Sequence, residues 1–417
     1  MAVSGEAQRD QVSFAGWHFA RLDLEMQRLK IGIDIHSIGS QSGGNETYYR
    51  ELLRGLLRFR SNYQFYLYYT HPSAAGEINP TEDFCLQRLV PSQRWLRVPF
   101  TIPWRARVDD LDLFHAQFIV PPCLKCKAVT TIPDIAYEHF PQFFPRRQVA
   151  LLKMLVRASA RKADHIITVS EHSKRDIVET YGVDPDNITV TYEGAGSEFV
   201  PLGRQAAKEE VARKYGIHQP FILYVGRLQA RKNLARLVAS YARVRKLGFR
   251  HKLIFVGKPD SLFQQVSARI RELEIREDVI QLGYVPGADL PSLYNAAEVF
   301  IYPSLYEGFG LPVLEAMACG TPVITTQSSS LAEVAGDACL LVDPVDESSI
   351  ASALECILGD RGLRERLSQA GLKRSSQFSF EKTAQQTLGV YERVLHGKNA
   401  GRENCVPSLS VEHHSCL

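Results

Sequence analysis

Short apolar runs alternate with helical patterns along most of this chain, and no other feature constrains the fold as strongly. In the first half the runs predict buried strands over 30–36, 65–69, 111–115, 128–132, 165–169 and 188–192. Helical patterns over 147–162 and 171–181 fill two of the gaps, and an amphipathic pattern with Asn45 as its expected N-cap follows the first run. Strands that alternate with helices predict an α/β fold with a parallel sheet.

The same alternation starts again near residue 220, after a polar segment that begins at Pro201. The predicted strands are 221–225, 253–256, 279–282, 299–302, 322–325 and 339–342, and the predicted helices are about 233–247, 261–273, 290–297, 312–319, 347–358 and 380–395. A single core rarely grows to 417 residues. We therefore expect two Rossmann-like domains that face each other across a cleft.

The domain boundaries follow from these patterns. We expect a first domain over 30–200, a second domain over 201–380, and a C-terminal helix over 381–397 that crosses back to the first domain. The stretches 1–29 and 398–417 show no clear period. We expect a poorly ordered extension and a disordered tail there.

Charge and composition exclude several function classes. The chain has 49 basic and 46 acidic residues, a net charge of +3, which is too balanced for a dedicated nucleic-acid binder. It contains no apolar run of about 18 residues, so no membrane-spanning helix is expected. The N-terminus lacks the basic start and apolar core of a secretory signal, and the eight cysteines are scattered rather than dense. These features favour a cytoplasmic protein.

The strongest motif is Glu307-Gly-Phe-Gly-Leu-Pro-Val-Leu-Glu315, directly after a predicted strand. Pro312 suits the first position of a helix, and the glycines before it allow a ligand to approach the backbone. A helix N-terminus with unpaired amides binds phosphate well. Two carboxylates beside such a site are suited to hydroxyl groups, because a carboxylate only accepts hydrogen bonds. An anion flanked by two polyols is the outline of a nucleotide sugar.

A second motif, Gly226-Arg227-Leu-Gln-Ala-Arg-Lys232-Asn233, also follows a predicted strand. Arg227 closes the strand and Lys232 opens the next helix, so both can point into the cleft from one loop. Arginine offers phosphate a planar fork, and lysine offers a point charge. Beside the glutamate motif, this loop predicts a clamp for a diphosphate.

A third motif, Ser42-Gly43-Gly44-Asn45, follows the first predicted strand. Glycines at a helix start bring backbone amides close to a ligand. A glycine pair is weak evidence by itself, but here it would close the cleft from the other side.

These motifs identify a family resemblance. The chain resembles retaining glycosyltransferases of the GT-B fold, in the large family 4 that includes bacterial mannosyltransferases. The resemblance covers roughly residues 30 to 395, and its most specific part is the pair Glu307 and Glu315 with seven residues between them.

The resemblance implies roles for the motif residues. Arg227 and Lys232 would hold the donor diphosphate, Glu307 the hydroxyls of the transferred sugar, and Glu315 the ribose. The backbone from Gly308 through Phe309 and Gly310 to Leu311 would touch the phosphates or the sugar. The Gly43–Gly44 loop would cover the reaction centre. The first domain would then hold the acceptor and the second the donor, without a metal or another cofactor.

One position departs from the family pattern. Related sequences often carry His-Asp after a strand that ends in Thr-Ile, and here Pro133 stands where that histidine would be, followed by Asp134. Proline has no titratable group. We therefore expect His115, or less readily His139, to be the cleft histidine, and Asp134 to contact the acceptor or the sugar.

The segment 146–162 reads RRQVALLKMLVRASARK, with six basic residues and no acidic one. This pattern fits a helix that lies on anionic lipid. It also fits a helix that packs its apolar side inward and exposes a basic face, and this second interpretation is the preferred one.

The overall resemblance favours transfer of a hexose, first mannose from GDP-mannose rather than glucose from UDP-glucose, to a glycan or lipid-linked acceptor. The alternatives are another GT-B enzyme of nucleotide sugars, such as an epimerase, and a non-catalytic binder. Cys123 and Cys126 form a lone CxxC with no second pair, so zinc is not expected. The Gly194-Ala-Gly196 stretch lacks a third glycine and predicts a turn rather than a dinucleotide site.

Overall fold

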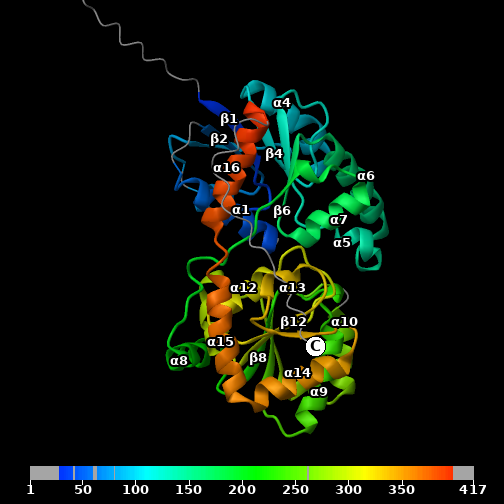
Figure 1. The fold of residues 1–417 in the computed structure, drawn as a ribbon, viewed down its shortest axis with the longest axis vertical. Coiled ribbons are helices and arrows are strands. Elements are labelled where there is room, and N and C mark those ends of the chain that lie inside the picture. Colours follow the sequence, from blue (N-terminus) through cyan, green and yellow to red (C-terminus); the bar gives the residue numbers. More distant parts are fainter. Residues whose placement is uncertain (1–27, 41–42, 60–62, 79, 261–262, 398–417) are drawn as a thin grey trace, which may run out of the picture.

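The computed structural model describes residues 28–40, 43–59, 63–78, 80–260 and 263–397. The expectations for residues 1–27, Ser42 and 398–417 lie outside these ranges. Two halves, each built on a parallel sheet with helices packed on it, lie one above the other (Figure 1). The α/β class and the two parallel sheets are confirmed.

The first sheet has seven parallel strands in the order β3-β2-β1-β4-β5-β6-β7. The strands are β1 (Leu29–Asp34), β2 (Tyr63–Tyr69), β3 (Phe84–Arg88), β4 (Leu113–Gln117), β5 (Lys127–Thr131), β6 (His165–Thr168) and β7 (Ile188–Val190). The helices of this half are α1 (Gly44–Leu56), α2 (Ala74–Glu77), α3 (Arg94–Leu96), α4 (Ile102–Val108), α5 (Ala136–His139), α6 (Arg146–Lys162) and α7 (Glu171–Tyr181). One wide helical turn, Arg97–Thr101, joins α3 to α4.

The second sheet has six parallel strands in the order β10-β9-β8-β11-β12-β13. The strands are β8 (Phe221–Val225), β9 (Lys252–Val256), β10 (Val279–Gly283), β11 (Val299–Tyr302), β12 (Val323–Thr326) and β13 (Leu340–Val342). The helices of this half are α8 (Arg204–Tyr215), α9 (Leu234–Lys246), α10 (Phe263–Glu272), α11 (Leu290–Ala296), α12 (Leu311–Ala318), α13 (Ser330–Ala335), α14 (Glu347–Gly359) and α15 (Arg361–Ser375).

Burial explains why the apolar runs form the inner strands. Every residue of β8 (FILYV) and of β11 (VFIY) is buried, as expected for parallel strands covered by helices on both faces. In both sheets the strand order reverses beside the first strand of its half, β1 or β8. Open parallel sheets bind ligands at the carboxyl ends of the strands near this point.

The last helix, α16 (Phe380–His396), packs against α1 of the first half, and Figure 1 shows the two side by side. A Cβ added to Gly55 of α1 would lie 2.7 Å from the Ala384 Cβ, so the two backbones approach closely. Tyr391 of α16 belongs to the apolar core of the first half. The final helix therefore ties the end of the second half to the first sheet.

The structure adds elements that the sequence patterns missed, namely β3, the short helices α2, α3, α4 and α5, and α8, α13 and α15. Two details of the expected caps were wrong. Gly43, with φ of +75°, precedes α1, and Asn45 lies inside that helix. Helix α12 begins at Leu311, so Pro312 is its second residue, where the amide would also lack a helical partner.

Candidate active site

The loop between β11 and α12 carries Glu307. Its last residue, Gly310, has φ of +108°, a conformation that favours glycine, and the helix starts directly after it. The Ser329 hydroxyl accepts a hydrogen bond from the Glu307 amide at 3.0 Å, and the Ser330 hydroxyl donates to the Glu307 and Phe309 carbonyls. These contacts hold the loop in place, and Glu307 is only 7% exposed.

Two cations surround the buried Glu307 carboxylate. The Lys232 ammonium donates to one of its oxygens and also to the Tyr302 hydroxyl at 2.7 Å. The Arg231 guanidinium donates to the other oxygen at 3.0 Å and to the Tyr306 carbonyl at 2.6 Å. A short helical turn, Ala230–Lys232, directs both cations inward from the loop after β8. We call Arg231, Lys232 and Glu307 the charge cluster.

Burial and mutual attraction set the ionisation of the charge cluster. Burial opposes the charge on Glu307, but Arg231 and Lys232 together outweigh it and lower the pKa of Glu307 to about 2. Burial and the neighbouring Arg231 charge lower the pKa of Lys232 to about 8, against the attraction of Glu307. At neutral pH the cluster therefore holds two cations and one anion, a net positive charge at the start of α12.

Arg227 does not join the charge cluster. Its side chain is exposed, and no hydrogen bond or ion pair links it to another side chain within the described ranges. The residue next to Lys232 that contacts Glu307 is Arg231, which the sequence analysis left unassigned. The sequence signal that could have pointed to Arg231 was its position directly before Lys232 in the same motif.

Glu315 lies one turn into α12 and is 8% exposed. The Tyr294 hydroxyl of α11 donates to its carboxylate at 2.7 Å. Burial raises the pKa of Glu315 to about 7, although the hydrogen bond from Tyr294 works in the opposite direction. A buried carboxylate with acceptor capacity left over can receive hydroxyl donors.

The glycine after Glu307 meets the first half of the molecule. The Ser170 hydroxyl donates to the Gly308 carbonyl at 2.7 Å, and the Ser173 hydroxyl donates to the Pro133 carbonyl at 2.8 Å. A Cβ added to Gly308 would lie 2.5 Å from the Pro133 carbonyl oxygen and 3.0 Å from the Asp134 Cβ. The structure thus places Asp134 beside the glycine loop, and only glycine allows this approach.

Further contacts fix the junction between the halves. The Tyr306 hydroxyl donates to Asp176 of α7, and the His139 ring stacks on the Tyr306 ring at 5.7 Å. His139 also hydrogen bonds to Asp176 at 2.5 Å. At the N-terminus of α7, the Glu333 carboxylate accepts from the Glu171 and His172 backbone amides, which is a favourable place for an anion.

Other predicted ligand residues lie near this junction with different roles. Phe309 and Leu311 are buried in the same apolar cluster as strand β1, so their side chains pack and only their backbones are available to a ligand. Gly43 and Gly44 are exposed at the start of α1, and a Cβ at either would meet no atom within 4 Å. The loop of the first half is therefore open.

The expectation of a cleft-facing His115 is wrong. Its ring is 0% exposed and hydrogen bonds to the Tyr391 hydroxyl at 2.7 Å and the Thr131 hydroxyl at 2.6 Å. Burial lowers its pKa to about 3, so the ring is neutral. His115 joins α16 to the first sheet, and no surface of its ring faces a ligand.

Replacing Tyr391 by phenylalanine tests this structural role. The change leaves a buried ring nitrogen of His115 without its partner, and we expect the free energy of unfolding to fall by about 1–3 kcal/mol. Thermal or urea unfolding measures the loss. The turnover number at a temperature where the variant is folded should not change, and a large fall in it would contradict the assignment.

Sequence reasoning missed Glu193, a buried residue just after β7. Burial, with smaller contributions from the charges of Glu315 and Asp134, raises its pKa to about 8. It is therefore mostly protonated at neutral pH. The only available signal was its position just before the Gly194-Ala-Gly196 turn.

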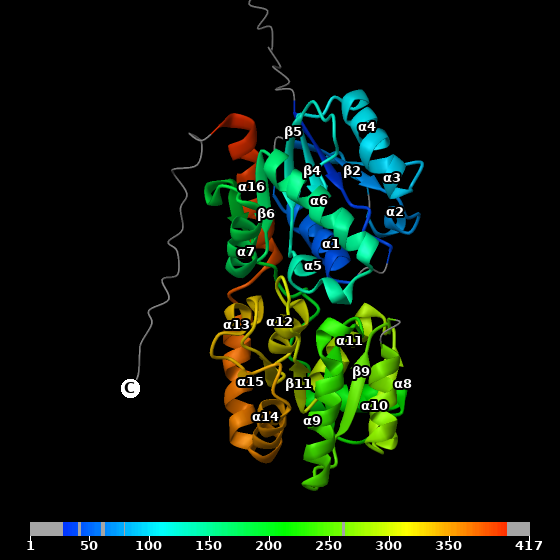
Figure 2. The ribbon, with the colours of Figure 1, turned by 90° about the vertical axis from the view of Figure 1, so that its right-hand side faces the viewer.

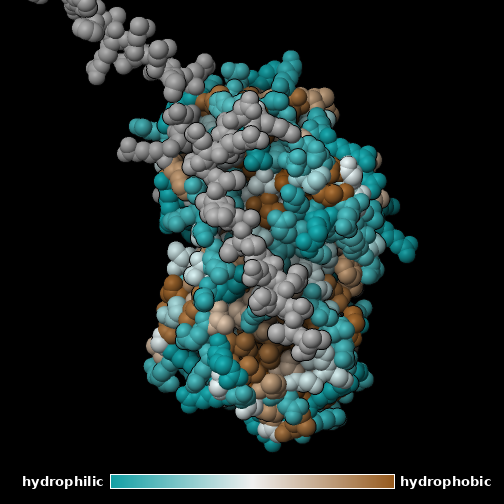
Figure 3. Space-filling view, in the orientation of Figure 1, coloured by the Kyte–Doolittle hydropathy of each residue, from teal (hydrophilic) through white to brown (hydrophobic). Residues whose placement is uncertain are grey.

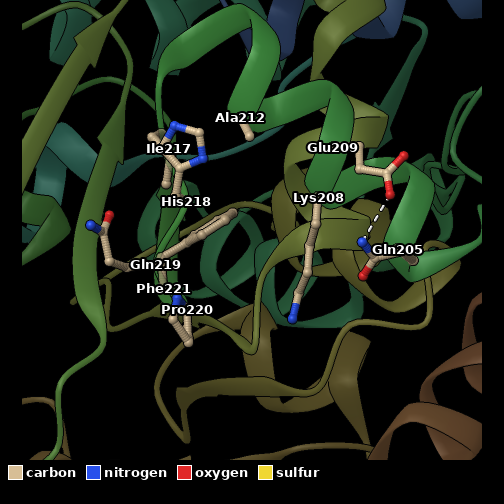
Figure 4. A pocket seen from close by; sticks show the side chains of 9 residues that line it. All are labelled: Gln205, Lys208, Glu209, Ala212, Ile217, His218, Gln219, Pro220 and Phe221. Atoms are coloured by element: carbon tan, nitrogen blue, oxygen red, sulfur yellow. Dashed lines mark hydrogen bonds between the residues drawn. The ribbon is translucent and has the colours of Figure 1, made fainter.

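A hollow of about 300 Å³ lies elsewhere, between α8 and the start of β8 (Figure 4). Figure 4 shows Lys208 and His218 on its wall, and Gln205 donating to Glu209 at 2.9 Å. Because it lies at the amino end of β8, it is at the opposite edge of the sheet from the charge cluster. We assign it no part in the site.

Comparison with known proteins places this geometry in a family. Residues 42–198 match the model "Glycosyltransferase Family 4", and residues 207–374 match "Glycosyl transferases group 1". The chain is 37% identical over 296 residues to the O-antigen chain mannosyltransferase B of Escherichia coli, which covers 69% of this chain and 76% of the relative.

Solved structures share the fold. Sucrose-phosphate synthase from Thermosynechococcus elongatus has a TM-score of 0.75 at 21% identity, over 88% of this chain and 100% of that one. The Anabaena protein HepE, solved with UDP and glucose, has a TM-score of 0.70 at 18% identity, over 87% of this chain and 99% of that one. The chain therefore belongs to glycosyltransferase family 4, a retaining and metal-independent family of the GT-B fold that transfers sugars from nucleotide-sugar donors.

Proposed function

We propose that this glycosyltransferase moves mannose from GDP-mannose to a glycan or lipid-linked acceptor in polysaccharide or glycoconjugate biosynthesis. The similarity to the Escherichia coli mannosyltransferase supports mannose, whereas the HepE complex with UDP and glucose comes from a protein only 18% identical. We place the reaction in the cytoplasm, because the six cysteines in the described ranges are free thiols.

The observation that carries the proposal is the charge cluster. Transfer breaks the bond between the sugar and the diphosphate, and negative charge develops on the leaving diphosphate. Groups that are already positive where this charge appears are commonly the largest contribution to catalysis. Lys232 is held in place by Tyr302 and Glu307, and so costs little reorganisation when the donor binds. The exposed Arg227 can supply a second cation to the phosphates.

The carboxylates suit the two polyols of the donor. Each oxygen of Glu307 already accepts from one cation and has capacity for a sugar hydroxyl. Glu315, one turn further along the helix, would accept from the ribose. The amides at the start of α12 would bind the phosphates or the sugar, and Asp134 would contact the sugar or the acceptor from the first half.

Release of nucleoside diphosphate tests the function directly. The protein is incubated with GDP-, UDP- and ADP-sugars and lipid-linked acceptors, beside a Lys232→Ala variant and a Lys246→Ala control. Lys246 is exposed at the far end of α9. Release from GDP-mannose that is lost only in Lys232→Ala supports the proposal. Release from a different donor alone contradicts the choice of mannose, and release unaffected by Lys232→Ala contradicts the site.

The pH dependence of kcat/KM for the donor should be bell-shaped. This quantity reports the free enzyme. Glu315 must be ionised to accept from the ribose, so kcat/KM rises with pH through its pKa of about 7. Lys232 must be protonated, so kcat/KM falls as pH rises through its pKa of about 8. Initial rates across this range give the profile.

Mutation can test which group causes the rise of kcat/KM on the acid side of the profile. Glu315→Gln should lower kcat/KM and remove the rise near pH 7, because glutamine does not titrate. Glu355→Gln, an exposed position on α14, is the matched control and should leave the profile unchanged. An acid limb that survives in Glu315→Gln would assign it to another group.

A further inference from the structure

Large apolar side chains are exposed on the helical segment between β3 and β4. Trp95 is 63% exposed, Phe100 66%, Trp104 60% and Val108 56%, with Leu96 at 46%. Leu96, Phe100, Trp104 and Val108 recur every fourth residue, about one helical turn apart. We call these five residues the aromatic stripe. Isolated exposed apolar residues are common, but a contiguous group marks an interaction surface.

The segment is anchored from its other side, so the aromatic stripe is held outward. Ile102 and Ala106 of α4 are buried in an apolar cluster of the first half. Arg97 is 4% exposed, and its guanidinium donates to Asp34 at the end of β1 at 2.9 and 3.2 Å. Figure 2 shows α3 and α4 on the outer side of the first half. Brown, apolar surface interrupts the teal at the top of Figure 3, where Figure 1 places α4.

The surroundings of the aromatic stripe are basic. Residues 88–108 contain five arginines and no acidic residue. Arg97 is buried against Asp34, Arg105 pairs with Asp109 at 2.9 Å, and the exposed Asp110 follows directly. Arg88 and Arg107 are exposed, and the Arg105 guanidinium lies 5.7 Å from the centre of the Trp104 ring. Arginine beside an exposed indole suits a boundary where a polar, anionic layer lies over an apolar one.

Helix α6 is a neighbour that adds mainly charge, with Met154 as its one large exposed apolar side chain among the described residues. Val98 of the segment packs in the same cluster as Leu152, Leu155 and Val156 of α6, so the apolar side of that helix faces the protein core. Of the two interpretations of 146–162, the structure favours inward packing. Arg146 and Arg147 at its start are exposed.

We propose that the aromatic stripe is a docking surface for an anionic lipid bilayer, with Trp95, Phe100 and Trp104 at the level of the headgroups and acyl chains. The exposed Arg88 and Arg107 pair with lipid phosphates, and Arg146 and Arg147 at the start of α6 add to the basic surface. A second copy of the chain is a poorer occupant, because a two-fold interface brings each patch onto itself and places like charges opposite one another. Within the described ranges no helix is both long and apolar enough to cross a bilayer, so the contact lies on the surface.

Flotation with lipid vesicles tests the proposal without any sugar donor. The full chain is mixed with vesicles of phosphatidylcholine alone or with added phosphatidylglycerol. We expect the protein to float with the anionic vesicles. The Phe100→Ser/Trp104→Ser variant should bind at least about tenfold less, because it lacks the aromatic area that the bilayer would bury. The matched control, Leu247→Ser/Val345→Ser, removes two side chains that are 59% and 61% exposed in the second half and should bind like the wild type.

Tryptophan fluorescence gives an independent readout. The chain has three tryptophans, and Trp17→Phe leaves only Trp95 and Trp104. Anionic vesicles should shift the emission of this variant to shorter wavelength, and lipids brominated in the acyl chain should quench it. Failure of the wild type to float, equal flotation of the Phe100→Ser/Trp104→Ser variant, or an unshifted emission would each overturn the proposal. So would a dimer in solution that this variant dissociates without any vesicle binding.

Discussion

Replacing Lys232 by alanine is expected to slow sugar transfer by about 10²–10³, the usual cost of one group that stabilises charge in a transition state. Lys232 is 6% exposed, and its ammonium hydrogen bonds to Tyr302 and Glu307. In this position its charge is not screened by water, so its attraction for a leaving diphosphate is strong. The variant should fold, because Arg231 still neutralises Glu307.

Steady-state kinetics distinguishes a catalytic role from simple donor binding. If Lys232 acts on the charge that develops during transfer, kcat falls together with kcat/KM. Lys246→Ala, at the far end of α9, should leave both unchanged. A variant in which KM rises while kcat stays the same would restrict Lys232 to ground-state binding and contradict the expected effect.

Replacing Glu307 by glutamine is expected to reduce both activity and stability. The change leaves Arg231 and Lys232 buried together without an anion between them. Breaking a buried ion pair by removing one partner costs about 3–5 kcal/mol. At 2–4 °C per kcal/mol for a domain of this size, the melting temperature should fall by about 10 °C. The transferred sugar would also lose an acceptor for its hydroxyls.

Calorimetry at several pH values tests the electrostatic cause. The folded pKa of Glu307 is about 2, below its ordinary value of 4.5, so its stabilising effect is present above pH 4.5 and is lost as pH falls towards 2. The difference between wild type and Glu307→Gln should shrink over that range. A Lys232→Met/Glu307→Gln variant should be less destabilised than the sum of the single changes. A melting temperature of Glu307→Gln equal to that of the Glu355→Gln control would contradict the burial of an unpaired charge.

Most of the fold could be predicted because the inner strands are continuous apolar runs. Residues 221–225 form β8 as predicted, since a run in which every side chain is buried fits a covered parallel strand. The misses have a common cause. The strand at 84–88 lies at the edge of its sheet, is mostly only partly buried, and ends in the polar residues Gln87 and Arg88. The helices over 204–215 and 361–375 have too little apolar periodicity to be recognised.

The candidate site was predicted as far as residue type and spacing allow. Glu307, Glu315 and Lys232 follow strands in the second half, and loops at the carboxyl ends of parallel strands meet at one edge of a sheet. Which side chains point inward depends on a single helical turn. Ala230–Lys232 turns Arg231 and Lys232 towards Glu307 and leaves Arg227 exposed, and the pattern of letters does not encode that rotation.

The sequence by itself determined the elements that depend on local periodicity and the motif residues that follow the strands. The tertiary structure alone decided the surroundings of each side chain. It buried His115 under α16, where the ring bonds to Tyr391, a residue 276 positions further along the chain. It also turned the aromatic stripe outward, although apolar residues are usually buried. Contacts between distant segments set burial and charge pairing, so no local pattern could have supplied them.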